Sequence, residues 1–182
     1  MNFLSEYNIE IFFLAHDLAG QSVALDRIVV FFADYLAYVL VVVAAVSFMA
    51  WKNNWAAKMN ALLGALITIL IARGLFVELI QFFYTHPRPF FALSGVHPLL
   101  VETSSSFPSG HATVFFALSV FMYRYSKGLG GLFFVLSGIM GFARVAAGVH
   151  YPLDILGGAI LGTCVGFMSV AVVDKFLFKN VI

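Results

Sequence analysis

Long apolar stretches separated by short polar segments make up most of this 182-residue chain. A helix needs about 20 apolar residues to cross a bilayer, and strands of a soluble fold would be shorter and alternate in polarity. The pattern therefore predicts an all-α integral membrane protein with about five transmembrane helices. We expect these spans at about 28–51, 59–84, 108–125, 132–148 and 152–176.

The N-terminal segment 3–20 differs from these stretches because acidic residues and a histidine interrupt its apolar positions. Its apolar run is too short for a span. We expect an amphipathic helix that lies in the membrane interface or dips partly into it. A short additional span is the alternative.

The composition agrees with membrane insertion, because 62% of the residues are hydrophobic and only 10% are charged. The mean hydropathy is +0.99. A net charge of +1 gives no reason to expect a nucleic-acid partner, and the single Cys164 excludes an internal disulfide and a cysteine-rich metal site. We therefore expect membrane lipids as the surroundings of one membrane-embedded domain, residues 1–182. The sequence identifies no protein partner.

Five spans distribute the polar segments between two sides of the membrane. One side receives the basic residues Lys52, Lys58, Arg124, Lys127, Lys175 and Lys179. The positive-inside rule makes that side cytoplasmic. The other side, which is then extracytoplasmic, receives the N-terminal segment, the long loop 85–107 and the turn 149–152. It also receives the outer ends of the spans, with Arg88, His111, Arg144, His150 and Asp154.

The segment Phe107-Pro108-Ser109-Gly110-His111 has the pattern of a helix start. A serine of the preceding triplet 104–106 can serve as the N-cap, and Pro108 suits the first turn. The free N–H groups of such a turn attract anions, and Gly110 leaves room for a close approach. A capped helix whose first turn carries a histidine is the plain structural alternative.

Two arginines, two histidines and a carboxylate at one membrane depth suggest a phosphate site. Arg88 and Arg144 can each grip an oxyanion with a planar guanidinium. Asp154 follows His150 by four residues and can accept a hydrogen bond from one ring nitrogen, which leaves the other as a nucleophile. His111 at the helix start is then the general acid for the leaving oxygen.

These residues resemble the motifs of the type 2 phosphatidic acid phosphatase superfamily. Pro108-Ser109-Gly110-His111 is similar to its central motif, Arg144-x5-His150-x3-Asp154 to its third, and Arg88-Pro89 to the end of its first. The resemblance implies hydrolysis of a phosphoester through a phosphohistidine, without metal or cofactor. It also implies that His150 is the nucleophile, Asp154 its partner and His111 the acid. The phosphate ligands would be Arg88, Arg144, Ser109 and Gly110.

Two positions depart from the family pattern. The lysine that opens the first motif is replaced by Gln81, and the serine before the arginine of the third motif is replaced by Ala143. Losing the lysine removes one cation from the phosphate site. Gln81 can still donate a hydrogen bond, so it remains a candidate phosphate ligand, and His86 is a candidate source of positive charge.

Within the superfamily, the small size, the N-terminal segment and Pro87-Arg88-Pro89-Phe90 resemble the bacitracin-resistance type of undecaprenyl diphosphate phosphatase. That resemblance implies conversion of undecaprenyl diphosphate to undecaprenyl phosphate at the extracytoplasmic face of the plasma membrane. Other lipids remain open as substrates: phosphatidylglycerophosphate, phosphatidate and lipid A phosphate.

Two other classes of function also remain open. One is a metal-dependent hydrolase that uses His86, His97, His111, His150 and Glu102, although the chain has no compact ligand motif such as His-Glu-x-x-His. The other is a lipid carrier without chemistry. His86 and His97 are more simply loop residues, and we expect Arg73 to form a structural pair with Glu78 inside the bundle, although Glu78 can also support the site.

Overall fold

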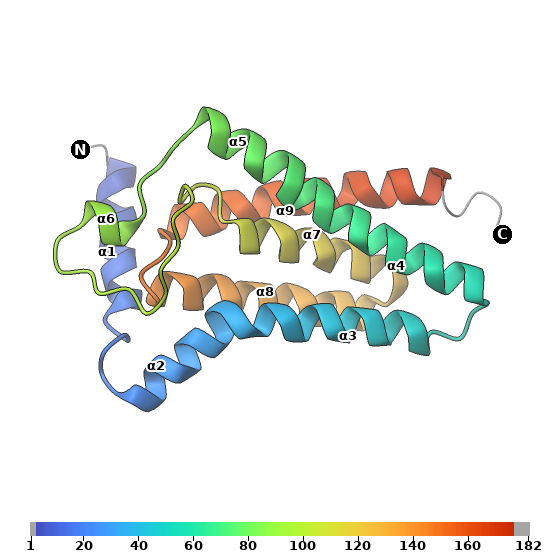
Figure 1. Ribbon diagram of the computed structural model, residues 1–182, viewed down its shortest axis with the longest axis horizontal. Helices are drawn as coiled ribbons and strands as arrows, with labels where there is room; N and C mark the ends of the chain where they lie inside the picture. The colour runs from blue at the N-terminus through green and yellow to red at the C-terminus, as the bar shows by residue number, and fades with distance from the viewer. Residues whose placement is uncertain (1–2, 177–182) are drawn as a thin grey trace.

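The computed structural model describes residues 3–176, and the regular structure in this range is helical. Figure 1 shows most of these helices running along one common direction. In chain order the elements are α1 (Phe3–His16), α2 (Val23–Val30), η1 (Phe31–Tyr35), α3 (Leu36–Ala50), α4 (Trp55–Ile69), η2 (Leu70–Val77), α5 (Glu78–Phe83), α6 (Pro89–Ala92), α7 (Gly110–Tyr125), α8 (Lys127–Ala146) and α9 (Pro152–Phe176). The elements η1 and η2 are π-helical turns within continuous helices, a feature that occurs frequently at functional sites.

Four helices of the described chain are long and apolar enough to cross a membrane. They are Val23–Ala50, Trp55–Phe83, Lys127–Ala146 and Pro152–Phe176, close to four of the five predicted spans. The predicted span 108–125 corresponds to α7, which has only 16 residues. The all-helical prediction is therefore confirmed, and four of the five spans meet the length that a bilayer requires.

The outward sides of these four helices carry large apolar side chains. Val46, Phe82, Val135 and Phe167, one on each helix, are each exposed by at least 60%. A water-soluble protein rarely leaves so many such residues uncovered, whereas lipid tails solvate them well. The exposed side chains support the assignment of a multi-pass membrane protein.

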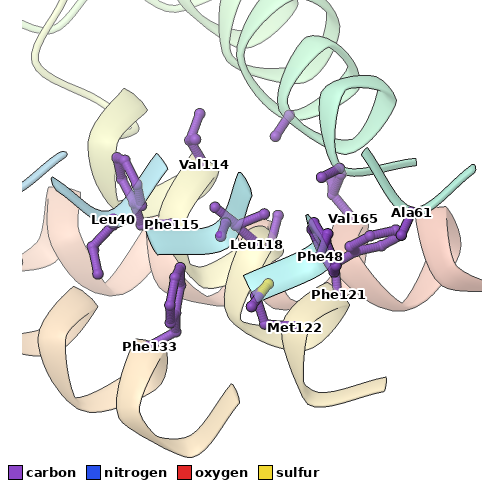
Figure 2. Close-up of a cluster of buried hydrophobic side chains, with 14 of the residues drawn as sticks. Leu40, Phe48, Ala61, Val114, Phe115, Leu118, Phe121, Met122, Phe133 and Val165 are labelled. Carbon is purple, nitrogen blue, oxygen red and sulfur yellow. The ribbon is translucent and has the colours of Figure 1, made fainter. Parts of the chain in front are cut away.

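Helix α7 forms the centre of the bundle, between α8 and α9 (Figure 1). Its apolar residues are buried on several sides, because α3 and α4 cover the remaining face. Figure 2 shows side chains of these helices meeting around Leu118 and Phe121 of α7. A central helix contacts protein rather than lipid, which explains why α7 need not have the length of a complete span.

Close contact between α7 and α9 depends on glycine. A Cβ atom at Gly162 would lie 2.2 Å from the carbonyl oxygen of Thr113, so a side chain there would force the helices apart. Small residues at such contacts are typical of helices packed in a membrane.

The glycine-rich segment 128–131, which lies between the predicted spans 108–125 and 132–148, belongs to a helix, so the predicted start of the second of these spans is wrong. Helix α8 begins at Lys127, and the Ser126 side chain caps it by accepting from the Leu129 N–H. A Cβ atom at Gly130 would lie 2.3 Å from the Cα of Tyr123. The glycine therefore permits a tight crossing of α7 and α8 instead of breaking the helix.

The two ends of the bundle differ in structure and charge. At one end, the α3–α4 and α7–α8 connections carry Lys52, Arg124 and Lys127, and Lys175 lies near the end of α9. Lys179, which the sequence assigns to the same side, lies outside the described residues. At the other end, α1 crosses the bundle and the α5–α7 loop covers it (Figure 1). We call this second end the loop end.

Candidate active site

Arg88 and Arg144 meet at the loop end, where both approach the same nitrogen of the His150 ring. Nη1 of Arg88 lies 3.2 Å from Nε2 of His150, and Nη2 of Arg144 lies 3.3 Å from the same nitrogen. Both arginine side chains are buried. Because a guanidinium only donates hydrogen bonds, Nε2 acts here as an acceptor with a lone pair directed at the two cations.

The other nitrogen of the ring faces a carboxylate. Nδ1 of His150 lies 3.5 Å from Oδ2 of Asp154, and Oδ2 accepts hydrogen bonds from the Ser106 hydroxyl at 2.5 Å and from the Tyr151 N–H at 2.8 Å. Ser106 Oγ also lies 3.4 Å from Nδ1. The carboxylate favours the tautomer that carries its proton on Nδ1, which leaves Nε2 unprotonated.

A tight turn after α8 brings His150 to this place. Gly148 has a φ of +80°, and its Cβ position would lie 2.9 Å from the His16 ring. A larger residue would be strained there by both backbone and space. The turn also allows His16 to bond the carbonyl oxygen of Ala146, so α1 is tied to the base of the site.

Burial and charge set the protonation of the site. Burial lowers the pKa of His150 to about 4 against the opposing effect of Asp154, and the two nearby arginines lower it further. The ring is therefore neutral at physiological pH. Burial also lowers the pKa of Arg88, although Glu102 opposes that shift.

Glu102 occupies the anion position between the two arginines. One carboxylate oxygen lies 2.6 Å from Nη2 of Arg88, and the other pairs with Nη2 of Arg144. Burial raises the pKa of Glu102, but Arg144 and Arg88 outweigh it and lower the pKa to about 2. Sequence reasoning considered Glu102 only as a metal ligand, because no pattern links residue 102 to residue 144.

Arg144 has further capacity for an anion. Its Nη1 donates to the Ala33 carbonyl oxygen at 3.1 Å, whereas its buried Nε has no hydrogen-bond partner among the described residues. An unpaired buried donor is costly unless a ligand satisfies it. The arrangement therefore suits an oxyanion with several acceptor oxygens, such as a phosphoryl group.

A cavity of about 390 Å³ opens beside these arginines. Its walls are formed by Arg73, Gln81, Arg88, Val101, Glu102, Thr103, Ser104, Gly110 and His111. Gly110 and His111 belong to the first turn of α7, whose positive dipole end thus borders the cavity that Arg88 also lines. Nε2 of His111 lies 3.9 Å from Oδ1 of Asp34, a neighbour that the sequence did not indicate.

Ser109 is the N-cap of α7, and the prediction that a serine of 104–106 plays this part is wrong. Its hydroxyl accepts from the Ala112 N–H at 3.5 Å, and α7 begins at Gly110 rather than at Pro108. The Ser109 side chain is fully buried. Its predicted contact with phosphate stays a prediction.

Gln81 holds the loop that leads into α7. Its side-chain nitrogen donates to the carbonyl oxygens of Ser105 and Pro108, at 3.1 and 3.2 Å. Gln81 also lines the cavity, so the residue that replaces the lysine of the family still borders the site.

The pair that was expected inside the bundle is instead at the cavity. Arg73 and Glu78 do form an ion pair, but their side chains are 43% and 59% exposed, so the expectation of a shielded pair is wrong. The π-helical turn η2 contains Arg73, and this side chain lines the cavity wall.

Neither His86 nor His97 lines this cavity. His86 stacks on Tyr84 and makes an edge contact with Tyr151, and His97 is exposed in the loop. Within residues 3–176, no three His, Cys, Asp or Glu side chains are grouped as ligands for a metal ion.

Comparisons with known proteins agree with the motifs. The family model described as PAP2 superfamily matches residues 62–178. The chain is 33% identical over 165 residues to the undecaprenyl-diphosphatase BcrC of Bacillus subtilis. This alignment covers 88% of this chain and 81% of that protein. It is also 32% identical over 159 residues to the bacitracin transport permease protein BcrC of Bacillus licheniformis. This alignment covers 87% of this chain and 76% of that protein.

The fold has a close match among solved structures. The crystal structure of LpxE from Aquifex aeolicus superposes with a TM-score of 0.74 at 26% identity, over 91% of this chain and 95% of that one. The sequence match, the structural match and the four apolar helices lead to one conclusion: this chain belongs to the PAP2 superfamily and is a multi-pass membrane phosphatase of that family.

Proposed function

We propose that the protein is a lipid diphosphatase that removes the terminal phosphate of a polyprenyl diphosphate. The substrate is undecaprenyl diphosphate, and the products are undecaprenyl phosphate and inorganic phosphate. One observation carries the proposal: the unprotonated Nε2 of His150 faces the Arg88–Arg144 pair, where a phosphoryl group would bind.

In the first step, Nε2 of His150 attacks the terminal phosphorus. The N–P bond forms while the bond from phosphorus to the bridging oxygen breaks. Arg88 and Arg144 stabilise the charge on the transferred phosphoryl oxygens, and Asp154 stabilises the positive charge that develops on the ring. His111 donates a proton to the bridging oxygen, so the lipid monophosphate leaves without a build-up of charge.

In the second step, water hydrolyses the phosphohistidine. His111, now unprotonated, accepts a proton from the water, and the new P–O bond replaces the N–P bond. His150 is thereby restored with its proton on Nδ1 and its lone pair on Nε2. Atoms and protons balance without any group other than water.

Glu102 must leave the arginine pair when substrate binds. Its carboxylate compensates the charge of Arg88 and Arg144 before substrate arrives, and a phosphate with more charge and more acceptor oxygens replaces it. A buried arginine pair without any anion would be costly, so this exchange avoids an uncompensated intermediate.

The choice of lipid rests on the relatives. Both BcrC proteins align over most of the chain, and one of them is named an undecaprenyl-diphosphatase. Phosphatidylglycerophosphate, phosphatidate and lipid A phosphate use the same chemistry and are the competing substrates. A non-catalytic carrier would have no need for a neutral, buried histidine backed by a carboxylate.

We also propose that the site faces the extracytoplasmic side of the plasma membrane. The opposite end of the bundle carries Lys52, Arg124, Lys127 and Lys175, and such an excess of basic residues marks cytoplasmic loops. Undecaprenyl diphosphate hydrolysed at the loop end would thus leave its phosphate outside the cell.

The test is phosphate release from a panel of lipids by purified wild type and His150→Ala, each with and without a chelator. We expect the wild type to prefer undecaprenyl diphosphate with or without chelator, and His150→Ala to lose at least about 10³-fold in rate. A preference for another lipid would contradict the assignment of undecaprenyl diphosphate as the substrate. Intact phosphate release by His150→Ala would overturn the mechanism, and loss of activity in chelator would favour a metal-dependent enzyme.

A further inference from the structure

Arg73 extends from η2 towards the first turn of α7. If Gly110 carried a Cβ atom, that atom would lie 3.1 Å from Nε of Arg73 and 3.2 Å from its Cδ. The guanidinium therefore lies directly over the residue that precedes His111. All three residues line the cavity that also contains Arg88.

The site thus has two separate groups of positive charge. Arg88 and Arg144 both contact Nε2 of His150 and the Glu102 carboxylate. Arg73 forms no hydrogen bond or ion pair with His150 or Glu102 in the described chain, and it lies instead against the α7 turn. Two cationic positions on one cavity match a ligand that carries two anionic groups.

The guanidinium of Arg73 has donors to spare. Nη1 donates to Glu78. Within residues 3–176 the guanidinium makes no other hydrogen bond, so Nε and Nη2 remain for a ligand. Glu78 orients the guanidinium and offsets its charge, which reduces the cost of an arginine within a membrane-spanning helix. The Arg73 side chain is 43% exposed on the cavity wall, and an ion pair that is so exposed contributes little to stability. A purely structural role therefore explains the position of Arg73 poorly.

We propose that Arg73 binds the phosphate that stays attached to the lipid, and so makes the enzyme selective for diphosphates over monophosphates. This inference rests on the proposed function. When the terminal phosphate lies between Arg88, Arg144 and His150, the bridging oxygen must lie within reach of His111. The second phosphate then lies beside His111, where Arg73 is placed by its contact with Gly110.

The assignment also accounts for the missing lysine of the first motif. The Gln81 side chain at that position is neutral, and its amide nitrogen donates to the loop carbonyl oxygens of Ser105 and Pro108. Arg73 lies on the same continuous helix, Trp55–Phe83, eight residues earlier, and brings a cation to the same cavity. The same helix thus supplies a cation to the cavity from Arg73 rather than from position 81.

The test compares farnesyl diphosphate with farnesyl monophosphate as substrates of the purified protein in detergent. The quantity measured is selectivity, the ratio of kcat/KM for the diphosphate to kcat/KM for the monophosphate. Because the variant loses the charge-assisted hydrogen bonds to the second phosphate, Arg73→Gln is expected to lower this ratio by about tenfold or more. Arg73→Lys, which keeps the charge, is expected to restore part of it.

Two further variants separate binding from stability. Lys52→Gln removes a cation at the opposite end of the bundle and serves as the matched control, with an expected ratio equal to that of the wild type. Glu78→Gln breaks the ion pair but keeps Arg73, so the ratio is expected to stay well above that of Arg73→Gln. Equal losses in Arg73→Gln and Glu78→Gln, on both substrates and with a lowered melting temperature, would show a structural pair and overturn the inference.

The outcomes also distinguish this inference from the function on which it rests. Wild type that hydrolyses no prenyl diphosphate would overturn the proposed function, and the role of Arg73 with it. Wild type that prefers the diphosphate, together with an unchanged ratio in Arg73→Gln, would overturn the role of Arg73 alone.

Discussion

Glu102 and Arg144 form an ion pair beside Nε2 of His150, and the same carboxylate pairs with Arg88. A loop residue thus holds both arginines from the side on which an oxyanion would bind. Glu102 stays ionised across the physiological range, because the arginines lower its pKa to about 2 against the effect of burial. It is therefore a constant competitor for any anion at this position.

Removing that competitor is expected to tighten anion binding. Glu102→Gln keeps the size of the side chain but loses its charge, so the inhibition constant of vanadate should fall by about tenfold, in line with the strength of charged hydrogen bonds. The measurement is inhibition of phosphate release by vanadate. Glu10→Gln, an exposed change on α1, is the control, and an inhibition constant that Glu102→Gln does not alter would contradict the competition.

The acid role of His111 is testable through the leaving group. His111→Asn should slow hydrolysis of a lipid diphosphate by about 10²–10⁴-fold, because the bridging oxygen then leaves unprotonated. p-Nitrophenyl phosphate has a leaving group that needs no proton, so its hydrolysis should fall much less. The control is His97→Asn in the exposed part of the loop. Equal losses on the two substrates would assign His111 to another role.

Ser106 is expected to act as a positioning residue. Its hydroxyl donates to Oδ2 of Asp154 at 2.5 Å, so Ser106→Ala loosens the carboxylate that holds His150. We expect kcat to fall by about tenfold, the size of one lost buried hydrogen bond, with little change in KM. Ser106→Thr should recover much of the loss, and Ser94→Ala in the same loop is the control. A rise in KM at constant kcat would refute this role.

The lowered pKa of His150 predicts how stability depends on pH. In the folded protein burial lowers this pKa from its ordinary 6.5 to about 4. Between pH 6.5 and pH 4 the unfolded chain therefore binds more protons than the folded one, and stability falls as the pH falls through this window. Glu102 adds a loss only below about pH 4.5, since its pKa drops from 4.5 to about 2.

The measurement is the melting temperature in detergent at pH 7 and pH 5 for the wild type and for His150→Gln. The melting temperature of the wild type should fall further from pH 7 to pH 5 than that of the variant, because the variant has no group at this position to protonate. An identical loss in both proteins would show that other groups govern the acid sensitivity.

Two glycines offer a paired test of helix packing. Gly162→Ala places a methyl group 2.2 Å from the Thr113 carbonyl oxygen and should separate α7 from α9, at a cost of about 1–3 kcal/mol. Gly138→Ala on α8 meets nothing within 4 Å and should be neutral or should stabilise by up to about 1 kcal/mol through helix propensity. Thermal unfolding in detergent measures both, and similar destabilisation by the two variants would contradict the packing argument.

Much of the fold and part of the site could be predicted from the sequence, because the decisive signals are local. The apolar runs correspond to four spanning helices, since a bilayer imposes its own length on any helix that crosses it. Arg144, His150 and Asp154 lie within 11 residues, so one turn between two helices brings them together. Arg88 joins them because the first motif ends where its helix reaches the same end of the bundle.

Other features could be determined only from the tertiary structure. Residues 128–131 are rich in glycine and lie between two predicted spans, yet they belong to α8, where Gly130 allows the close approach of Tyr123 of α7. The cap of α7 is Ser109 rather than an earlier serine, because the loop path places that hydroxyl over the Ala112 N–H. In both places the local composition is compatible with either structure, and contacts with a neighbouring helix or loop determine which one forms.

The sequence by itself determined that this is a multi-span membrane protein with the motifs of a phosphatase family, because hydropathy and short motif spacings need no knowledge of distant contacts. Only the tertiary structure decided that Glu102 faces the arginines, that Ser106 holds Asp154 and that Arg73 borders the cavity. Each of these contacts joins residues 37 to 48 positions apart (Arg73 to Gly110, Glu102 to Arg144, Ser106 to Asp154). No periodicity encodes such pairs, since the path of a long loop and the crossing of helices determine which side chains meet.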